Sequence, residues 1–353
     1  MVLRPVGLVT GLTALEATKN GLARPFVGGP AAFLACELFL DGTDGVEVVV
    51  APVSDIERWA EEEGGRTLEA VRSLLDALTR PRPPFAGLFL DRPAIMGIVN
   101  VTPDSFHDGG LFADPDAAIE QALALVDAGA DLIDVGGEST RPGADPVSED
   151  EELARIVPVI EALAGRQIKV SVDTRRTGVM EIAIERGASV VNDVCALSAP
   201  SAVEAVASSD AAVVLMHMQG TPGTMQDAPR YDHAPFEVCS WLARRVAVCE
   251  EAGIARDRVA IDPGIGFGKT DAHNLQIMSS LAMLQGIGCA VAVGVSRKSL
   301  IGRLATTVDT ADRLPGTVAL TTAASLQGAQ IHRVHDVEEA RQALSIIEAL
   351  ERV

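Results

Sequence analysis

Basic side chains are scarce in this sequence. Its 353 residues include 29 Lys and Arg against 49 Asp and Glu, which gives a formal net charge of −20. A nucleic-acid partner selects for a basic face, so this balance argues against nucleic-acid binding. Hydrophobic residues make up 48% and charged residues 22%, as expected for a globular protein with a solvated surface.

Cysteine pairs and long apolar runs are also lacking. The five cysteines are odd in number and form no CxxC pair, which indicates reduced, mostly buried thiols in a cytosolic protein. The most apolar early stretch, residues 25–40, contains Glu37 and is shorter than the roughly 20 apolar residues of a membrane-spanning helix. The first residues lack a signal-peptide pattern. We therefore expect a cytoplasmic protein that contacts no membrane.

From residue 95 onward, short β-branched runs alternate with Ala/Leu/Glu-rich helical stretches. Near-continuous apolar runs separated by helices are typical of a parallel sheet. One helical stretch opens with Ser148 and has Glu151 three residues on, which is capping-box spacing. The runs are IMGIVNVT (95–102), LIDVGGES (132–139), KVSVDT (169–174), VVNDV (190–194), AVVLMHM (212–218), VAIDPG (259–264), AVAVGVS (290–296) and IHRVHD (331–336).

Eight such units predict a (β/α)8 TIM barrel, for which about 250 residues is typical. An open doubly wound sheet is the structural alternative. Residues 1–85 do not follow the pattern and are predicted to form an additional N-terminal α/β region, with the barrel over 86–353. Within that region, residues 46–60 indicate a strand and a helix, 66–80 an amphipathic helix, and 81–87 a linker-like break. The role of the region is unknown, with packing or dimer stabilisation as the default.

The active site of such a barrel lies at the carboxyl ends of its strands. Each run here ends in, or leads to, residues able to do chemistry. One polar strand end is usually a cap, but a buried polar group without a partner costs about 1–3 kcal/mol, so a full ring of them indicates a site. The residues are Asn100, Thr102, Glu138, Ser139, Thr140, Arg141, Asp173, Asn192, Asp193, His217, Asp262, Arg297, Lys298, Arg333 and His335.

The segment IDPGIGFGKT (261–270) superficially suggests a phosphate-binding loop. A Walker A motif needs Gly, four residues and then Gly-Lys-Ser/Thr. With Gly268 as the second glycine, the first would fall at residue 263, which is proline. We interpret these glycines instead as letting the backbone approach a flat ligand beside Asp262. His217 is assigned no catalytic role and is expected to be a structural histidine inside the barrel.

The strand ends resemble those of the dihydropteroate synthases, pterin-binding barrels of folate biosynthesis. The resemblance covers roughly residues 86 to 351 and is specific because separate motifs occur in that family's order. The motifs are GIVNVTPDSFHDGG (97–110), DVGGESTRPGA (134–144), SVDT (171–174), VNDV (191–194), LMHMQGTPGTMQ (215–226), DPGIGFGKT (262–270), GVSRKSLIG (294–302) and HRVHDV (332–337).

The resemblance implies a transferase that condenses (7,8-dihydropterin-6-yl)methyl diphosphate with p-aminobenzoate, giving 7,8-dihydropteroate and pyrophosphate. Asp262 matches the carboxylate that accepts two parallel hydrogen bonds from the pterin, supported by Asn192 and Asp173. Lys298 matches a donor to the pterin carbonyl and ring nitrogen. Met216 is expected to line the pterin pocket.

For the departing pyrophosphate, Arg333 and His335 match the family's clamp, and Asn100 matches a ligand of Mg²⁺, the implied cofactor. The resemblance implies catalytic roles for these two clamp residues together with Asp173 and Lys298. The electron-rich dihydropterin ring stabilises a positive CH₂ group, so we expect strong leaving-group departure in a site that closes against water.

The p-aminobenzoate pocket is implied on the other side of the site. Ser299, at the start of a helix, matches a residue facing the carboxylate of p-aminobenzoate, and Gly294 counts among the substrate-binding residues. Sulfonamides, which mimic p-aminobenzoate, are expected to compete with it. The family is commonly dimeric, which implies a homodimer. The residues matching those that frame the pocket are Phe106, Asp108, Thr140, Arg141, Pro142 and Phe267.

Other functions are weighed against this one. A pterin-barrel methyltransferase shares the pterin carboxylate and Asn192 but does not need the SRKS and RVHD motifs. The same chemistry with a different arylamine acceptor stays open. A catalytically inactive binding subunit is disfavoured because the residues whose loss would mark it are all present, namely Asn100, Arg141, Asp262, Lys298 and His335.

Overall fold

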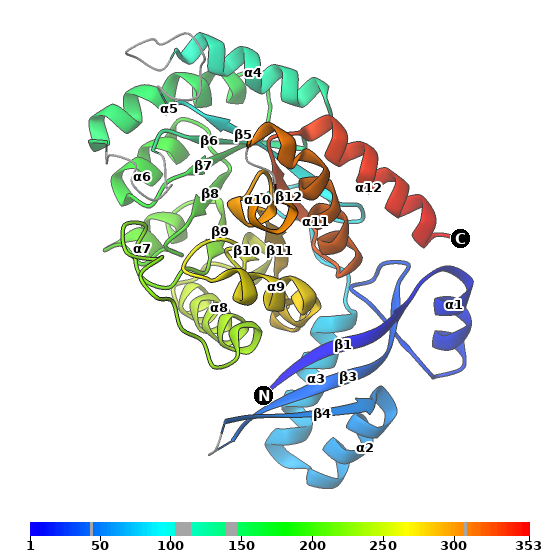
Figure 1. The fold of residues 1–353 in the computed structure, drawn as a ribbon. Coiled ribbons are helices and arrows are strands. Elements are labelled where there is room, and N and C mark those ends of the chain that lie inside the picture. The colour runs from blue at the N-terminus through cyan, green and yellow to red at the C-terminus, as the bar shows by residue number, and fades with distance from the viewer. Residues whose placement is uncertain (43–44, 103–113, 139–146, 307–308) are drawn as a thin grey trace.

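The computed structural model describes residues 1–42, 45–102, 114–138, 147–306 and 309–353. An N-terminal sheet with helices is attached to the side of a closed barrel (Figure 1). Eight parallel strands close the barrel in the order β10-β11-β12-β5-β6-β7-β8-β9, which confirms the predicted fold over an open sheet. The strands are β5 (Ala94–Asn100), β6 (Leu132–Gly136), β7 (Val170–Asp173), β8 (Val190–Asp193), β9 (Ala212–Met216), β10 (Val259–Asp262), β11 (Ala290–Val293) and β12 (Ile331–Val334).

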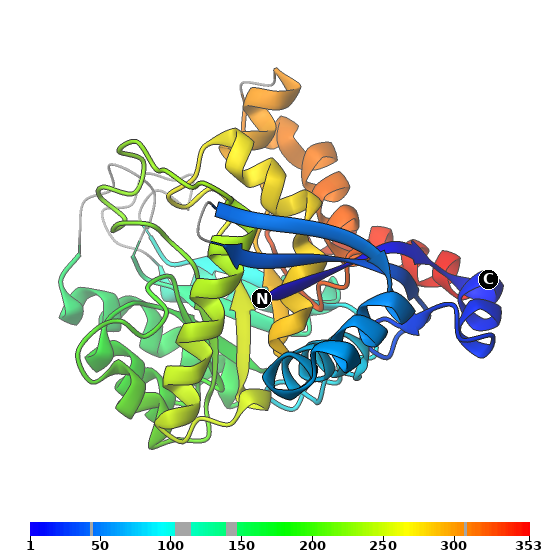
Figure 2. The same ribbon diagram turned by 90° about the horizontal axis from the view of Figure 1, so that it is seen from below.

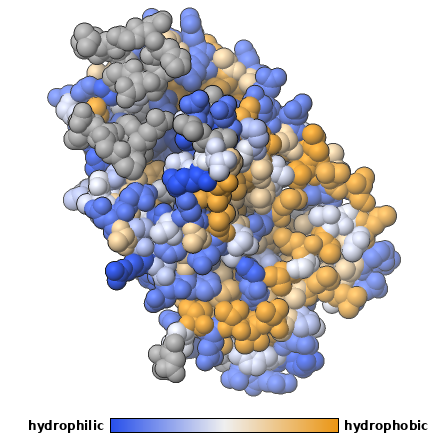
Figure 3. Space-filling view, in the orientation of Figure 1, coloured by the Kyte–Doolittle hydropathy of each residue, from blue (hydrophilic) through white to orange (hydrophobic). Residues whose placement is uncertain are grey.

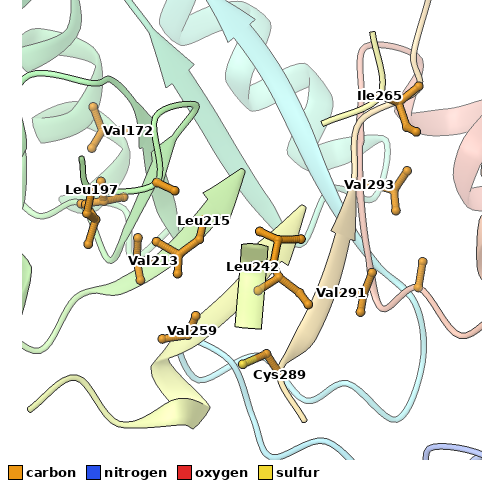
Figure 4. Close-up of a cluster of buried hydrophobic side chains, with 14 of the residues drawn as sticks. Val172, Leu197, Val213, Leu215, Leu242, Val259, Ile265, Cys289, Val291 and Val293 are labelled. Atoms are coloured by element: carbon orange, nitrogen blue, oxygen red, sulfur yellow. The ribbon is translucent and has the colours of Figure 1, made fainter. Parts of the chain in front are cut away.

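Side chains alternate between the inside and the outside of the barrel along each strand. Outward residues such as Val213 and Val291 pack against the surrounding helices, including Leu242 of α8 (Ala234–Glu251) (Figure 4). Because both faces are buried, the strands read as continuous apolar runs. The inward residues of the amino-terminal half form a second cluster, made of Ala94, Met96, Leu132, Val190, Ala212, Val214, Ala260, Ala290, Ala292 and Ile331.

The helices follow the strands and cover the barrel. Ser148 caps α5 as predicted by accepting a hydrogen bond from the Glu151 N–H at 3.2 Å, whereas the Glu151 carboxylate pairs with Arg155. No helix among the described residues is long and apolar enough to cross a membrane. The remaining helices of the barrel are α4 (Pro115–Asp127), α5 (Glu149–Ala164), α6 (Thr177–Glu185), α7 (Ala202–Ala207), η2 (Arg256–Arg258), α9 (Asp271–Ser279), η3 (Leu281–Ile287), α10 (Ser299–Ala305), η4 (Ala311–Arg313), α11 (Leu314–Leu326) and α12 (Val337–Glu351).

The N-terminal region is an antiparallel sheet with three helices. Strand β3 is central to it and pairs with each of the other three strands. The strand and helix predicted over 46–60 and the amphipathic helix predicted over 66–80 are confirmed as β4, α2 and α3. The elements are β1 (Val2–Val9), α1 (Gly11–Lys19), β2 (Arg24–Pro25), β3 (Ala32–Gly42), β4 (Gly45–Pro52), α2 (Val53–Glu63) and α3 (Gly65–Thr79).

The segment between α3 and β5 is packed into the barrel and is not a loose linker. Phe85 is 1% exposed and joins the inward cluster at the amino-terminal mouth of the barrel. The buried Arg82 guanidinium donates to the carbonyl oxygens of Gln285 (2.7 Å) and Ala77 (2.9 Å), which ties the barrel to α3. The proline-rich composition therefore marks a break in regular structure. The segment is nevertheless held in place by the hydrogen bonds of Arg82 and the burial of Phe85.

Candidate active site

Toward the carboxyl ends of the strands, the inward positions change from apolar to polar. The alternation that buries Met96, Leu132 and Val214 inside the barrel also directs the later residues of the same strands inward. Pairing then places these strand ends side by side, with Gly136 opposite Asp173 and Asp173 opposite Asn192. The inward residues at this mouth are Asn100, Asp134, Asp173, Asn192, Met216, Asp262, Gly294, Arg333 and His335.

Arg333 is held by two carboxylates inside the mouth. Its Nε donates to Asp134 Oδ2 at 2.6 Å and its Nη2 to Asp173 Oδ2 at 2.7 Å. The same Asp134 oxygen accepts a hydrogen bond from Asn192 Nδ2 at 3.0 Å. Asp134 is fully buried, and its Oδ1 has no hydrogen-bond partner among the described residues. A single carboxylate thus fixes two side chains that the sequence assigns to the substrate.

Asp134 is absent from the residues that the sequence analysis selects. The candidate residues are taken from the ends of the apolar runs, whereas Asp134 lies in the middle of the run LIDVG. The available signal is its charge within an otherwise apolar strand, two residues before Gly136 at the inward mouth. A charge at such a position is rarely buried without a partner.

The carboxylates and the guanidinium shift one another's pKa. Burial raises the pKa of Asp173 to about 7, with a further rise from Asp134 and an opposing effect of Arg333. Burial disfavours the charge on Arg333, but Asp134 and Asp173 outweigh it, so the pKa of Arg333 lies above its usual value. Arg333 therefore stays charged, and the pKa of Asp173 lies near neutral pH.

Asp262 ends β10 with its carboxylate at the same mouth. Its Oδ1 accepts a hydrogen bond from the Gly264 N–H at 2.7 Å, and burial raises its pKa. Gly294 lies beside it, since a Cβ atom at residue 294 would be 3.9 Å from Asp262 Oδ2 and 3.8 Å from Arg333 Cβ. The absence of a side chain at Gly294 thus leaves space between Asp262 and Arg333 for a ligand.

Lys269 is a second residue that the sequence analysis does not assign. It is 3% exposed, and its ammonium donates to the carbonyl oxygens of His217 (3.1 Å), Gly264 (3.0 Å) and Phe267 (2.8 Å). Burial lowers the pKa of Lys269 to about 7. The lysine of the GKT triplet therefore points into the protein and closes the loop after β10, which agrees with the rejection of a Walker A motif.

Two glycines of this loop are required for the packing of the chain, a role that the sequence does not indicate, whereas their approach to a flat ligand stays a prediction. Gly264 and Gly268 have φ of +67° and +59°, and a Cβ would lie 2.0 Å from the His217 carbonyl oxygen or 2.6 Å from that of Gln219. Both glycines are needed where the loop crosses the segment after β9. Gly266 differs, because a Cβ there would meet the Lys298 side chain at 3.4 Å.

Phe267, Lys298 and Met216 line one side of the mouth. The Lys298 ammonium lies 4.2 Å from the centroid of the Phe267 ring, within the range of a cation–π contact. Met216 is buried with Met218 in a small apolar cluster against which Phe267 packs. This side combines flat and polarisable surfaces with one cation, which suits a flat heteroaromatic ligand.

His335 continues the inward set of β12 two residues beyond Arg333. Its Nδ1 lies 2.9 Å from the Ser296 hydroxyl, and its backbone N–H donates to the same oxygen at 3.1 Å. Ser296 thereby sets the orientation of the imidazole. Ser299 is the first residue of α10 and is exposed, so it is accessible from solvent next to Lys298.

Several predicted site residues lie outside the described residues, namely Phe106, Asp108, Ser139, Thr140, Arg141 and Pro142. The structure does describe Glu138, directly before the second of these segments. Its carboxylate accepts from Arg175 Nε at 3.1 Å and from Arg176 Nη2 at 2.9 Å. Glu138 therefore anchors the end of its strand segment to the chain after β7.

His217 and Asp193 point away from the mouth. His217 contacts the Trp241 ring edge-on at 5.0 Å between centroids, and burial lowers the pKa of His217 to about 3. It lies between β9 and α8 and not inside the barrel, because Met216 takes the inward position. Asp193 accepts from the backbone N–H groups of Cys195 and Leu197, both at 2.7 Å, and shapes that turn.

Comparison with known proteins places the chain in a family. The family model described as pterin binding enzyme matches residues 96–335. The dihydropteroate synthase of Escherichia coli K12 is 47% identical over 263 residues, covering 74% of this chain and 93% of that protein. The chain belongs to the dihydropteroate synthase family. It is therefore a transferase with dihydropteroate synthase activity that acts on small-molecule substrates.

Solved dihydropteroate synthases resemble the barrel closely. A Xanthomonas albilineans dihydropteroate synthase with 4-aminobenzoic acid has a TM-score of 0.72 and 47% identity, covering 76% of this chain and 97% of that chain. The Yersinia pestis enzyme in complex with a sulfonamide drug also has a TM-score of 0.72 and 47% identity, covering 75% and 97% of the two chains. About a quarter of this chain thus lies outside each alignment, although the relatives are matched almost completely.

Replacing Asp134 by asparagine tests its hold on Arg333. An amide keeps the shape but lacks the charge, and a misplaced guanidinium should lower kcat/KM for the pterin diphosphate by about 10- to 100-fold. Asp131→Asn is the matched control, because Asp131 precedes the same strand and pairs with Arg341 at the opposite mouth. Steady-state kinetics should show the control within about twofold of the wild type, and equal losses in both variants would rule out a specific role.

The raised pKa of Asp173 predicts a pH dependence. Below pH 7 its carboxyl is increasingly protonated and neutral, and so loses its charge-assisted bond to Arg333. Hence kcat/KM for the pterin diphosphate should rise with pH between about 6 and 8, with an apparent midpoint near 7. Asp173→Asn should be less active and lack this rise. A variant that keeps the wild-type profile would show that another group titrates.

Proposed function

We propose that this chain condenses (7,8-dihydropterin-6-yl)methyl diphosphate with p-aminobenzoate through the ring of inward side chains at the barrel mouth. The observation that carries this assignment of residues is the convergence of Asp262, Asn192 and the Arg333 cluster on one mouth. A carboxylate and an amide there face two cations, Arg333 and Lys298. These groups complement a flat heterocycle at one end and an anionic leaving group at the other.

The pterin is proposed to lie against Asp262. A carboxylate can accept two parallel N–H bonds from the amino-pyrimidine edge, and its second oxygen adjoins the open space at Gly294. Asn192 is held in place by Asp134 and offers its amide oxygen to a donor of the ring. Lys298 is proposed to donate to the pterin carbonyl, while Met216 contacts the face of the ring.

The diphosphate is proposed to leave toward Arg333 and His335. Arg333 is partly buried and stays charged, and a cation fixed in position stabilises the negative charge that develops on the leaving group. His335 is oriented by Ser296 and can donate to a phosphate oxygen. Cleavage of the C–O bond would release pyrophosphate and produce the positive CH₂ group on the dihydropterin; the arylamine nitrogen would then form the C–N bond and lose one proton to pyrophosphate or water.

Mg²⁺ is proposed to accompany the diphosphate. Among the described residues, no group of three His, Cys, Asp or Glu side chains could form a metal cage. Asn100 ends β5 beside Gly136, where a Cβ would lie 3.8 Å from Asn100 Oδ1. One amide oxygen fits Mg²⁺ because this ion keeps waters and substrate phosphates as its other ligands. When bound, the ion would neutralise charge on the leaving pyrophosphate.

p-Aminobenzoate is proposed to bind between Phe267 and the start of α10. The Phe267 ring offers an apolar face, and Ser299 is exposed beside Lys298 for the carboxylate. The X. albilineans relative was solved with 4-aminobenzoic acid and the Y. pestis relative with a sulfonamide drug, which supports an arylamine site in this chain. Sulfonamides are proposed to compete with p-aminobenzoate here.

The decisive experiment measures pyrophosphate release and 7,8-dihydropteroate formation by the purified chain with both substrates and Mg²⁺. Asp262→Asn should lower kcat/KM for the pterin diphosphate by about 100- to 1,000-fold, because two charged hydrogen bonds are worth about 3–4 kcal/mol. Asp271→Asn is the control, since Asp271 pairs with Arg303 at the surface. Chelation of Mg²⁺ should also slow turnover. An Asp262→Asn variant with the wild-type rate would refute the pterin assignment.

A homodimer is proposed through the apolar face of the last helices. Leu326 of α11 and Ile346 and Leu350 of α12 are exposed, and hydrophobic side chains gather on this side of the molecule (Figure 3). An exposed apolar patch of this kind is typical of an interaction surface. Such an interface would be isologous, with the same helices contributed by each copy.

Sedimentation velocity tests the dimer. The wild type should sediment as two chains, and Ile346→Glu combined with Leu350→Glu should yield a folded monomer because two buried charges would oppose association. Val248→Glu is the control, since Val248 is exposed on α8, which follows β9 and is separated from α11 by α9 around the barrel. A monomeric wild type, or a double variant that remains dimeric, would contradict the proposed interface.

A further inference from the structure

The N-terminal region contacts the barrel at the start of α8, where the segment that binds the loop after β10 ends. The end of strand β3 lies beside the start of α8 (Figure 2). Phe39 of β3 is 3% exposed and belongs to the hydrophobic core of the barrel. Its ring lies 5.2 Å from that of His233, edge to face, and 6.4 Å from that of Phe236, stacked. The contact is thus a small aromatic cluster formed by two distant parts of the chain.

His233 fixes where the segment after β9 ends and α8 begins. Its Nδ1 accepts a hydrogen bond from the Phe236 N–H at 3.2 Å and so caps the helix. Its own backbone N–H donates to Glu237 Oε1 at 2.7 Å. Phe39 packs against this cap from outside the barrel, so the N-terminal region restrains one end of residues 217–233.

The same segment is fastened to the loop that carries Phe267. The Tyr231 hydroxyl, two residues before His233, donates to the Gly268 carbonyl oxygen at 2.8 Å. Gln226 Nε2 donates to the Gly266 carbonyl oxygen at 2.9 Å. These bonds hold the backbone on both sides of Phe267.

The loop after β10, which includes residues 264–268, depends on hydrogen bonds from other segments for its shape. Gly264, Gly266 and Gly268 all have positive φ, and glycine loses more conformational freedom on ordering than any other residue. Solved relatives are matched over 97% of their own length by three quarters of this chain. The chemistry of the family therefore resides in the barrel, and the additional residues of this chain are suited to adjusting it.

We propose that the N-terminal region positions Phe267 for the arylamine substrate, through the contacts of Phe39 with His233 and of Tyr231 with Gly268. This inference rests on the proposed function, in which Phe267 packs against the ring of p-aminobenzoate. Phe39 and Tyr231 are positioning residues, since they act through the loop. Their loss should alter the affinity for p-aminobenzoate more than the rate of the chemical step.

The test uses the full chain with Phe39→Leu, which keeps apolar volume but removes the aromatic contacts. The KM for p-aminobenzoate should rise about three- to tenfold, the range of couplings carried by packed networks, with kcat within about twofold. Phe33→Leu is the matched control: Phe33 is fully buried in the same strand but packs against Phe26 within the N-terminal region. It should lower the melting temperature comparably and leave this KM unchanged.

A double-mutant cycle separates positioning from general destabilisation. Tyr231→Phe removes only the hydroxyl and should by itself raise the KM for p-aminobenzoate. If Phe39 acts through Tyr231, the double variant should show no larger rise than the greater of the two single variants. Multiplicative effects in the double variant, or equal KM changes in Phe39→Leu and Phe33→Leu, would overturn the proposal.

Hydrogen exchange tests the coupling between Phe39 and the loop after β10 without relying on the enzyme assay. Amides of residues 264–268 should exchange faster in Phe39→Leu than in the wild type, and Phe33→Leu should leave them unchanged. A wild-type chain that makes no dihydropteroate would refute the proposed function and leave this structural coupling to be judged by exchange. Unchanged exchange in Phe39→Leu would refute the coupling even if the enzyme is active.

Discussion

Arg333 is held between Asp134 and Asp173, which lie 199 and 160 residues away in the sequence, and the site is organised around this buried charge cluster. A buried ion pair adds little net stability, because desolvation of the charges offsets their attraction. Within the part of the chain that the structure describes, one carboxylate oxygen of Asp134 also has no hydrogen-bond partner. The value of the cluster therefore lies in orientation, since it fixes the Arg333 cation of β12 and the Asn192 amide of β8, on strands that are not neighbours in the barrel, before a substrate arrives.

Much of the barrel could be predicted from sequence because its determinants are local and periodic. Each of the eight apolar runs contains a strand, and parallel strands bring their carboxyl ends to one mouth. Asp134 could not be predicted in the same way. Both faces of these strands are buried, so the sequence does not reveal which of two alternating positions is inward. Only the closed barrel shows that Asp134 points into the barrel, as Asp173 does, whereas Val135 points outward to the helices.

Contacts between distant segments account for what the sequence could not predict elsewhere. The proline-rich composition of residues 81–87 predicts a linker-like break, yet Phe85 fills the amino-terminal mouth of the barrel. Within the N-terminal region, the sequence predicts β4, α2 and α3, the last from its amphipathic pattern, but not β1, β2, β3 or α1. The attachment of this region through Phe39 follows from no such pattern, because it depends on where the start of α8 lies in the assembled fold.

The loop after β10 connects these observations. Its glycines allow close crossing of the segment after β9, and Lys269 binds carbonyl groups of both pieces of chain. Loop and segment are therefore joined by direct contacts, so a restraint on the segment should also act on the loop. Asp262 is the last residue of β10, directly before the loop, whereas Phe267 lies within the loop. An element that holds the segment after β9 from outside should accordingly affect the arylamine side of the site before the pterin side.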